Sequence, residues 1–390
     1  GDTDGSDQGT SSGSSASAGA DSGSGTDGAD DGADDGADDG ADDGADDETT
    51  AADMPTAYDA AGPFGVGART MTAPGRGRDV LATLWYPSPA EGGSATLAEL
   101  VDAADAPTLT KLLAEAPADC VRATTGATVD APVAPGAFPI VMFSHCLSCL
   151  GASSSLVAER LASHGMVVVG VTHSGDTLFE QLEGTVAPLD AAWLAVRASD
   201  VVAVFDAVLD DGAWAPSIDA ERAGAFGHSY GATTTGKVLQ DDARFVAGVA
   251  MAAPVENPLL PGVATAEITQ PMLFVLAQED NSILEIGNNL IRSNAAAMPG
   301  GSWLVELADA GHWSVSDLCG IVDAFEPGCG SARRQTNGEP FDYLDPDAAR
   351  QITASYVTAF FGLHLLGDPD AAAWLSAGEP SDVVTLTRFE

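Results

Sequence analysis

The feature that most constrains the fold is a series of short apolar runs separated by amphipathic segments. Residues 138–143 (FPIVMF) and 166–171 (MVVVGV) carry no polar side chain, whereas a strand with one face in water would alternate apolar and polar residues. Such runs are typical of strands buried on both faces of a parallel sheet. Between them, apolar residues recur at helical spacing, as in Leu194, Val201 and Val208. The pattern predicts an α/β fold, a mostly parallel sheet with helices on both faces.

Other segments follow the same two patterns. Further strands are predicted at 79–86, 223–226, 245–250, 271–276 and 303–307. Helices are predicted at 97–113, from Ser153 to Gly165, from Asp190 onward, from Tyr230 onward, at 283–297 and at 347–366. We expect one domain over residues 54–390, with an insert at about 87–137 and the loop at 174–189 as the cap or pocket elements.

Residues 1–53 differ in composition from the rest of the chain. They contain five consecutive Gly-Ala-Asp-Asp repeats from Gly28 to Asp47, 17 acidic residues and no lysine or arginine. A segment this polar and charged buries too little apolar surface to offset the entropy of ordering it. We expect a disordered acidic tether, and its aspartates do not have the spacing of an EF-hand calcium loop.

The body of the chain is acidic as well. Outside the tether, 41 acidic residues stand against 15 basic ones, so that part has a net charge of about −26. A negative surface of this size argues against nucleic acid and against anionic membranes as partners. No run approaches the ~20 apolar residues of a membrane span.

The start of the chain and its cysteines indicate export. A low-complexity run at Gly1 is what a mature exported protein shows once its targeting segment has been removed, so we expect a secreted, periplasmic or cell-surface protein. A removed lipid anchor on a lipoprotein is the only membrane link we expect. Five cysteines fit one or two disulfides. Cys319 and Cys329, ten residues apart, are the easiest pair to propose, while Cys120, Cys146 and Cys149 compete for a second bridge.

A Gly-x-Ser-x-Gly sequence carries the first sign of chemistry. Residues 227–231 read GHSYG and lie between a predicted strand and a predicted helix, the context of a nucleophile elbow. The turn is tight and needs small residues on both sides of the serine. A free serine hydroxyl is a poor nucleophile and needs a base. Ser229 is therefore a candidate nucleophile, and a plain strand-to-helix turn is the inactive alternative.

The partners of Ser229 follow in the order Ser, Asp, His. Asp280 comes at the end of the strand at 271–276, where the orienting acid is expected, with Glu279 as its competitor. His312 lies in the loop after the strand at 303–307. We expect Ser229 to attack an acyl carbonyl, His312 to transfer the proton and Asp280 to fix the imidazole. Backbone N–H groups should hold the oxyanion, one from Tyr230 and one from the loop after 138–143.

Together these segments resemble the α/β-hydrolase superfamily, and more narrowly the bacterial relatives of plasma platelet-activating-factor acetylhydrolase, often labelled predicted dienelactone hydrolases. The resemblance covers most of residues 62–366. It rests on the stretches GPFGVGARTM, DVLATLWYP, FPIVMFSH, LVAERLASHGMVVVGVTH, RASDVVAVFDAVL, GHSYG and AGHWSVSDLC. It implies triad roles for Ser229, Asp280 and His312, and oxyanion donors at Leu147 and Tyr230. The family usually has Ser-His-Gly-Leu-Gly where this chain has Ser-His-Cys-Leu-Ser at 144–148, and cysteine restricts a backbone that glycine leaves free.

The resemblance also implies a function. It implies a carboxylic-ester hydrolase acting on short-chain or phospholipid-type acyl esters, with polyester cleavage as the alternative, and no metal or organic cofactor. We expect a monomer. His145, Cys146, His173 and Trp313 are candidates for the substrate pocket. A surface binding protein without catalysis is a third possibility, and a redox or zinc role for the Cys-x-x-C at 146–149 is the fourth, although zinc usually needs four ligands.

Overall fold

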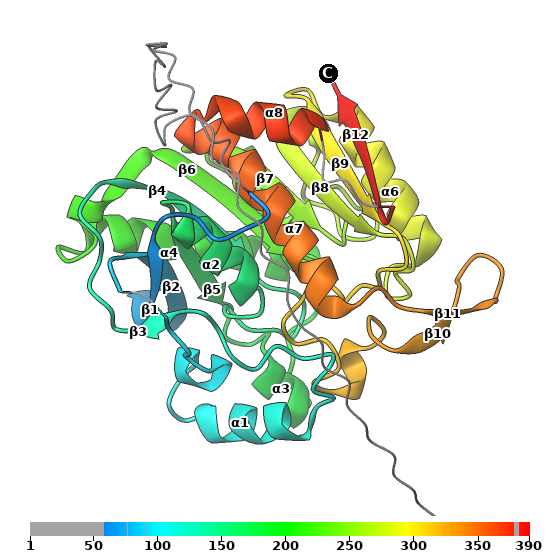
Figure 1. Ribbon diagram of the computed structural model, residues 1–390, viewed down its shortest axis with the longest axis horizontal. Coiled ribbons are helices and arrows are strands. Elements are labelled where there is room, and N and C mark those ends of the chain that lie inside the picture. The colour runs from blue at the N-terminus through cyan, green and yellow to red at the C-terminus, as the bar shows by residue number, and fades with distance from the viewer. Residues whose placement is uncertain (1–57, 76, 91, 378–381) are drawn as a thin grey trace, which may run out of the picture. The chain divides into compact units, whose positions relative to one another are not determined.

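Ten strands of the described residues form the central sheet, in the order β12-β9-β8-β7-β6-β4-β5-β2-β1-β3 (Figure 1). The computed structural model describes residues 58–75, 77–90, 92–377 and 382–390. The strands are β1 (Gly65–Pro74), β2 (Asp79–Ser88), β3 (Thr128–Val129), β4 (Phe138–Ser144), β5 (Val167–Thr172), β6 (Ile218–His228), β7 (Phe245–Met251), β8 (Met272–Ala277), β9 (Ser302–Leu307) and β12 (Val384–Phe389). The predicted tether at 1–53 lies outside the described residues.

The sheet is parallel from β5 through β4, β6, β7 and β8 to β9. Antiparallel pairs flank this region, β2 with β5 and β1 on one side and β12 with β9 on the other. A small separate sheet pairs β10 (Ser331–Arg333) with β11 (Pro340–Asp342). The predicted α/β class with a mostly parallel sheet is confirmed.

Helices cover both faces of the sheet. They are α1 (Ala106–Glu115), α2 (Ser155–Ser163), α3 (Leu178–Glu183), α4 (Ala191–Asp210), α5 (Tyr230–Asp241), α6 (Leu284–Ala297), α7 (Pro346–Phe361) and α8 (Pro369–Ala377). Successive residues of β4 point to opposite layers: Val141 belongs to the core cluster that includes residues of α2, α7 and α8, and Met142 belongs to the one that includes residues of α4, α5 and α6. In Figure 1, α2 and α7 lie in front of the sheet, in agreement with this division. Continuous apolar runs therefore form the strands because both of their faces are buried.

Three segments differ from the sequence prediction. The predicted helix at 97–113 is divided into a 3₁₀ turn at Leu97–Leu100 and the helix α1 at Ala106–Glu115. The predicted helix at 347–366 ends at Phe361 and passes through a π-turn at Gly362–Leu366, and α8 and β12 follow it. Strand β6 begins at Ile218, five residues before the predicted start. The first part of this strand, Asp219 to Arg222, is mostly polar and partly exposed. It therefore lacks the continuous apolar run that marks the other strands.

The insert at 87–137 is fastened to the body by buried polar contacts. Arg122 forms a two-pronged ion pair with Glu159 of α2, with both N···O distances at 3.0 Å. Arg350 of α7 donates to the carbonyl of Cys120.

No helix among the described residues is long and apolar enough to cross a bilayer.

The disulfides correct one sequence prediction. Cys329 pairs with Cys120, and Cys146 pairs with Cys149, whereas Cys319 is free and buried. The proposed Cys319–Cys329 bridge is therefore wrong. The short separation of Cys319 and Cys329 in the sequence favoured that pairing. In the folded chain the insert places Cys120 beside the loop that contains Cys329, and these two cysteines form the bond.

Removing the long bridge should destabilise the protein. The Cys120–Cys329 bond closes a loop with a sequence separation of 209 residues, and loss of a native disulfide costs about 2–5 kcal/mol. For a domain of this size we expect the Cys120→Ala/Cys329→Ala variant to melt roughly 3–7 °C below the wild type. Calorimetry of this variant beside Cys319→Ala, which removes a sulfur and no bond, measures the effect. Equal melting temperatures for the double variant and the wild type would contradict it.

Candidate active site

Ser229 lies between the last residue of β6 and the first residue of α5. Its backbone φ is 55°, a value that non-glycine residues seldom adopt. The neighbouring glycines allow the turn. A Cβ atom on Gly231 would lie 1.8 Å from the carbonyl oxygen of Ser144, and one on Gly227 would lie 2.1 Å from the carbonyl oxygen of Gly231. The local structure is a strained strand–turn–helix elbow of the kind that projects a side chain above the sheet.

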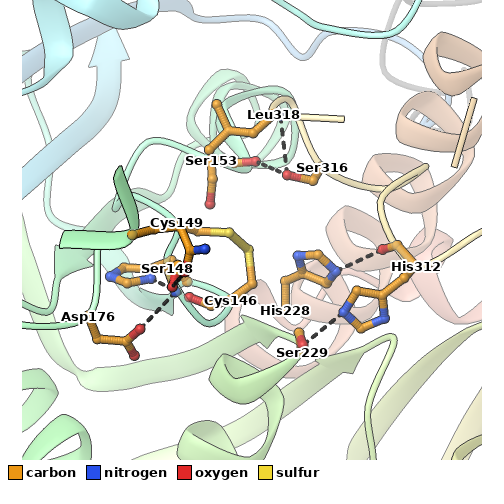
Figure 2. The surroundings of a disulfide bond; sticks show 12 residues. Cys146, Ser148, Cys149, Ser153, Asp176, His228, Ser229, His312, Ser316 and Leu318 are labelled. Atoms are coloured by element: carbon orange, nitrogen blue, oxygen red, sulfur yellow. Dashed lines mark hydrogen bonds between the residues drawn. A yellow bond between two sulfur atoms is a disulfide. The ribbon is translucent and has the colours of Figure 1, made fainter. Parts of the chain in front are cut away.

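His312 and Asp280 complete a hydrogen-bonded row with Ser229 (Figure 2 shows the serine and the histidine). His312 Nε2 lies 2.8 Å from Ser229 Oγ, and His312 Nδ1 lies 2.7 Å from Asp280 Oδ2. The second Asp280 oxygen accepts the amide hydrogens of Ser282 and Ile283. Asp280 is fully buried, so its carboxylate has a fixed direction. The structure thus brings together the three residues predicted from the sequence.

Glu279, the competing acid, points elsewhere. Its carboxylate accepts a hydrogen bond from Arg334 Nη1 at 3.1 Å and from the backbone amide of Gln335 at 2.8 Å. The two acids follow β8 in a turn, and of the two only Asp280 contacts His312.

His228 supports the loop that carries His312. Its Nε2–H donates to the carbonyl oxygen of His312 at 2.9 Å (Figure 2). Complete burial, together with the nearby His312, lowers the pKa of His228 to about 3, so the ring is neutral at physiological pH. Among the described residues, His228 is not one of those that line the cleft described below.

The loop after β4 is closed by the Cys146–Cys149 disulfide, which brackets Leu147 and Ser148 (Figure 2). The left-handed backbone of this loop falls on Ser148, whose φ is 59°, and not on Cys146. Both polar groups of Ser148 are held: its amide donates to Asp176 Oδ1 at 2.7 Å and its hydroxyl donates to Gln181 Oε1 at 3.1 Å. The strain therefore lies where the family resemblance places a glycine, and hydrogen bonds offset it.

Three of the four predicted pocket residues do not line the cleft. His145, Cys146 and His173 are fully buried and are absent from the lining of the cleft. The Nε2 atom of His145 accepts the amide hydrogen of His173, and the ring of His173 lies between Ser144 Oγ and Asp200. Burial, reinforced by the positive charge of Arg197, lowers the pKa of both histidines well below the usual value. The prediction was wrong for these residues because histidines that follow strands can bind the loop itself, and do so here.

A cleft of about 320 Å³ opens above Ser229. Ser229, His312, Trp313, Leu147 and Tyr230 all line it, so the fourth predicted pocket residue and both predicted oxyanion donors face the same space. The Tyr230 amide is the first of α5 and has no acceptor within the helix. Among the described residues, no group accepts a hydrogen bond from the Leu147 amide.

Exposed apolar side chains occur in the same chain segments as residues that line the cleft. Leu189 and Ile283 line it. Its lining residues also have strongly exposed apolar neighbours in the sequence: Leu182 (48%), Leu259 (90%), Leu284 (52%) and Ile286 (71%). We call these four residues together with Leu189 the apolar rim. Only Val129 and Val246 are comparably large and exposed elsewhere in the described part of the chain.

Comparison with known proteins agrees with this fold. Residues 53–180 match the model of the family "platelet-activating factor acetylhydrolase, isoform II", and residues 153–282 match that of the prolyl oligopeptidase family. The solved structure of a ferulic acid esterase from Streptomyces cinnamoneus superposes with a TM-score of 0.62 at 23% identity, covering 83% of this chain and 96% of that one. The domain has an α/β-hydrolase-like fold. The predicted superfamily resemblance is confirmed.

A curated relative of this chain is the platelet-activating factor acetylhydrolase of Bos taurus. The two are 24% identical over 204 residues, which is 42% of this chain and 44% of the bovine protein. The chain thus aligns with less than half the length of that relative.

Proposed function

We propose that the α/β-hydrolase domain hydrolyses carboxylic esters through an acyl-enzyme on Ser229. The observation that carries this proposal is the continuous row from Ser229 Oγ through His312 to the buried carboxylate of Asp280, at the floor of an accessible cleft. A serine becomes nucleophilic when a base is within hydrogen-bond reach and that base is itself oriented. The kinship with an acetylhydrolase and an esterase also favours esters.

The steps follow from the positions of the groups. Ser229 Oγ attacks the ester carbonyl while its proton passes to His312 Nε2, and Asp280 stabilises the resulting imidazolium. His312 then protonates the leaving alcohol, and a water molecule repeats the sequence to release the acid. The amides of Leu147 and Tyr230 are the proposed donors to the oxyanion, each contributing about 3 kcal/mol in comparable sites. The Cys146–Cys149 bridge would keep the Leu147 amide in place during both steps.

The proposal is tested with p-nitrophenyl esters of increasing acyl length and with a fluorophosphonate probe. We expect turnover of short-chain esters and one probe per chain, attached to the peptide that contains Ser229. Absence of turnover on every ester combined with absence of labelling would refute the esterase and favour a binding protein.

Polyester cleavage is the second candidate, and the apolar rim favours it. Leu189 lines the cleft and the other four exposed aliphatic residues lie within three positions of a lining residue in the sequence, so they are candidates for a surface on which an insoluble apolar ester could rest. None of the described residues of the insert at 87–137 lines the cleft itself. Short-chain, phospholipid-type and polymeric esters are therefore the substrate classes to compare.

Substitutions at the apolar rim should separate these classes. We expect Leu259→Ser/Ile286→Ser to lower the hydrolysis of a polyester film by about tenfold or more, because the variant loses apolar contact area. Hydrolysis of dissolved p-nitrophenyl acetate should change by less than about twofold. The matched control is Val129→Ser/Val246→Ser, which removes exposed apolar groups away from the cleft. If both double variants act equally on the film, the apolar rim has no role in substrate capture.

The disulfides support the proposed location outside the cytoplasm, since such bonds persist in oxidising compartments. The lipid anchor and the monomeric state stay predictions.

A further inference from the structure

We propose that Arg197 is a positioning residue that fixes both halves of the oxyanion site, a role that rests on the proposed esterase function. Arg197 lies in the middle of α4, has no exposed surface and does not line the cleft. It acts through the loop after β4 on one side and through the start of α5 on the other.

Arg197 uses both Nη atoms to contact residues in and around the loop after β4. Arg197 Nη2 donates to the carbonyl oxygen of His145 and, at 3.1 Å, to the hydroxyl of Ser144. Its Nη1 forms an ion pair with Asp176, which is also fully buried. The guanidinium group thus holds the residues that enter the loop directly before Leu147.

Asp176 extends this support past Leu147. Its Oδ1 accepts the amide hydrogen of Ser148 at 2.7 Å, and Ser148 is the residue with the left-handed backbone. A left-handed conformation costs a non-glycine residue about 1–2 kcal/mol, so an opposing interaction has to hold it. Arg197 and Asp176 therefore fix the backbone on both sides of the Leu147 amide.

The second half of the site is reached through α5. Arg197 Nε donates to Thr234 Oγ1 at 3.2 Å, and the guanidinium carbon lies 4.5 Å from the centre of the Tyr230 ring. Tyr230 supplies the other proposed oxyanion amide. One side chain therefore connects the two donors that must converge on the same oxygen atom.

The chemistry of arginine suits this position. A buried ion pair is a poor source of stability because both charges lose their hydration, and apolar residues of similar volume often serve stability equally well. A planar fork with several fixed N–H directions can hold several acceptors at once, which a lysine ammonium group on a flexible stem does less well. The buried charge of Arg197 is therefore better explained by the precise placement of the Leu147 and Tyr230 amides than by a contribution to the stability of the fold.

The experiment compares Arg197→Lys, Arg197→Met and Asp176→Asn with the wild type. We expect both Arg197 variants to lower kcat about 10²–10³-fold, the loss that follows removal of one oxyanion donor, while KM for a short-chain ester changes less than about threefold. Asp176→Asn keeps an acceptor for the Ser148 amide and should lose about tenfold. Affinity for an alkyl boronate, which forms a tetrahedral adduct with the serine, should fall in parallel with kcat.

The matched control is Arg122→Met, which also leaves a buried carboxylate, Glu159, without its arginine partner. It should lower the melting temperature and leave kcat within about twofold when assayed well below that temperature. If Arg197→Lys and Asp176→Asn retain wild-type kcat and boronate affinity while melting earlier, Arg197 serves stability alone and the positioning role is wrong. A wild type that neither hydrolyses esters nor reacts with a fluorophosphonate would instead overturn the proposed function and this role with it.

Discussion

Replacing Ser229 with alanine is expected to lower kcat for p-nitrophenyl esters by about 10⁶-fold, the effect of deleting the nucleophile in comparable serine hydrolases. The hydroxyl lies 2.8 Å from His312 Nε2, and the change removes one oxygen atom from a partly exposed side chain. The backbone of the turn stays in place because Gly227 and Gly231 remain. KM should change little, since the cleft keeps its walls.

The matched control for Ser229→Ala is Ser282→Ala, a serine that lines the same cleft without contacting His312. This control should keep kcat within about threefold and should still bind a fluorophosphonate. A Ser229→Ala protein that retains a tenth or more of the wild-type rate would show that another nucleophile performs the reaction.

Replacing Asp280 with asparagine is expected to lower kcat by about 10⁴-fold. The asparagine side chain fills the same space and can still accept the amide hydrogens of Ser282 and Ile283 through its oxygen. Its NH₂ group then faces His312 Nδ1 and favours the wrong imidazole tautomer, because Nδ1 would have to accept a hydrogen bond. The melting temperature should change far less than the rate.

Glu279→Gln provides the comparison, since Glu279 is adjacent in sequence and is held by Arg334 and the Gln335 amide. We expect a change in kcat of less than about threefold. A larger loss of kcat for Glu279→Gln than for Asp280→Asn would show that Glu279, and not Asp280, orients His312.

Much of this arrangement could be predicted from the sequence because it depends on local patterns. Apolar runs predicted the parallel strands, since a strand buried on both faces has no polar positions to interrupt the signal. The elbow GHSYG and the chain order of Asp280 and His312 predicted the row of three residues. The insert at 87–137 could be recognised by its length. That its described residues do not line the cleft depends on the tertiary fold and could not be predicted from the sequence.

The pairs that are remote in sequence could not be predicted in the same way. Nothing near Cys120 indicates Cys329 as its partner. Arg197 did leave a signal, because it lies three residues after Leu194 and four before Val201, on the apolar stripe of α4. A charged residue on a buried stripe needs a buried partner. Asp176, in a loop 21 residues away, could be identified only from the structure.

The free thiol of Cys319 has a consequence for how the protein matures. In the native state it borders the segment that ends in Cys329, where a Cβ atom on Gly328 would lie 3.1 Å from its sulfur. Burial raises its pKa to about 12, so it stays protonated and cannot exchange with the neighbouring bridge.

The unfolded chain has no such protection. There the thiol has its ordinary pKa of about 8.5, and closing the short loop from Cys319 to Cys329 costs less entropy than closing the long one from Cys120. Early oxidation would therefore favour the non-native pair. Because Cys319 can compete for Cys329, correct pairing depends on the order of folding and oxidation. Either the insert with Cys120 must pack against the body before the cysteines oxidise, or an isomerase must correct the pairing afterwards.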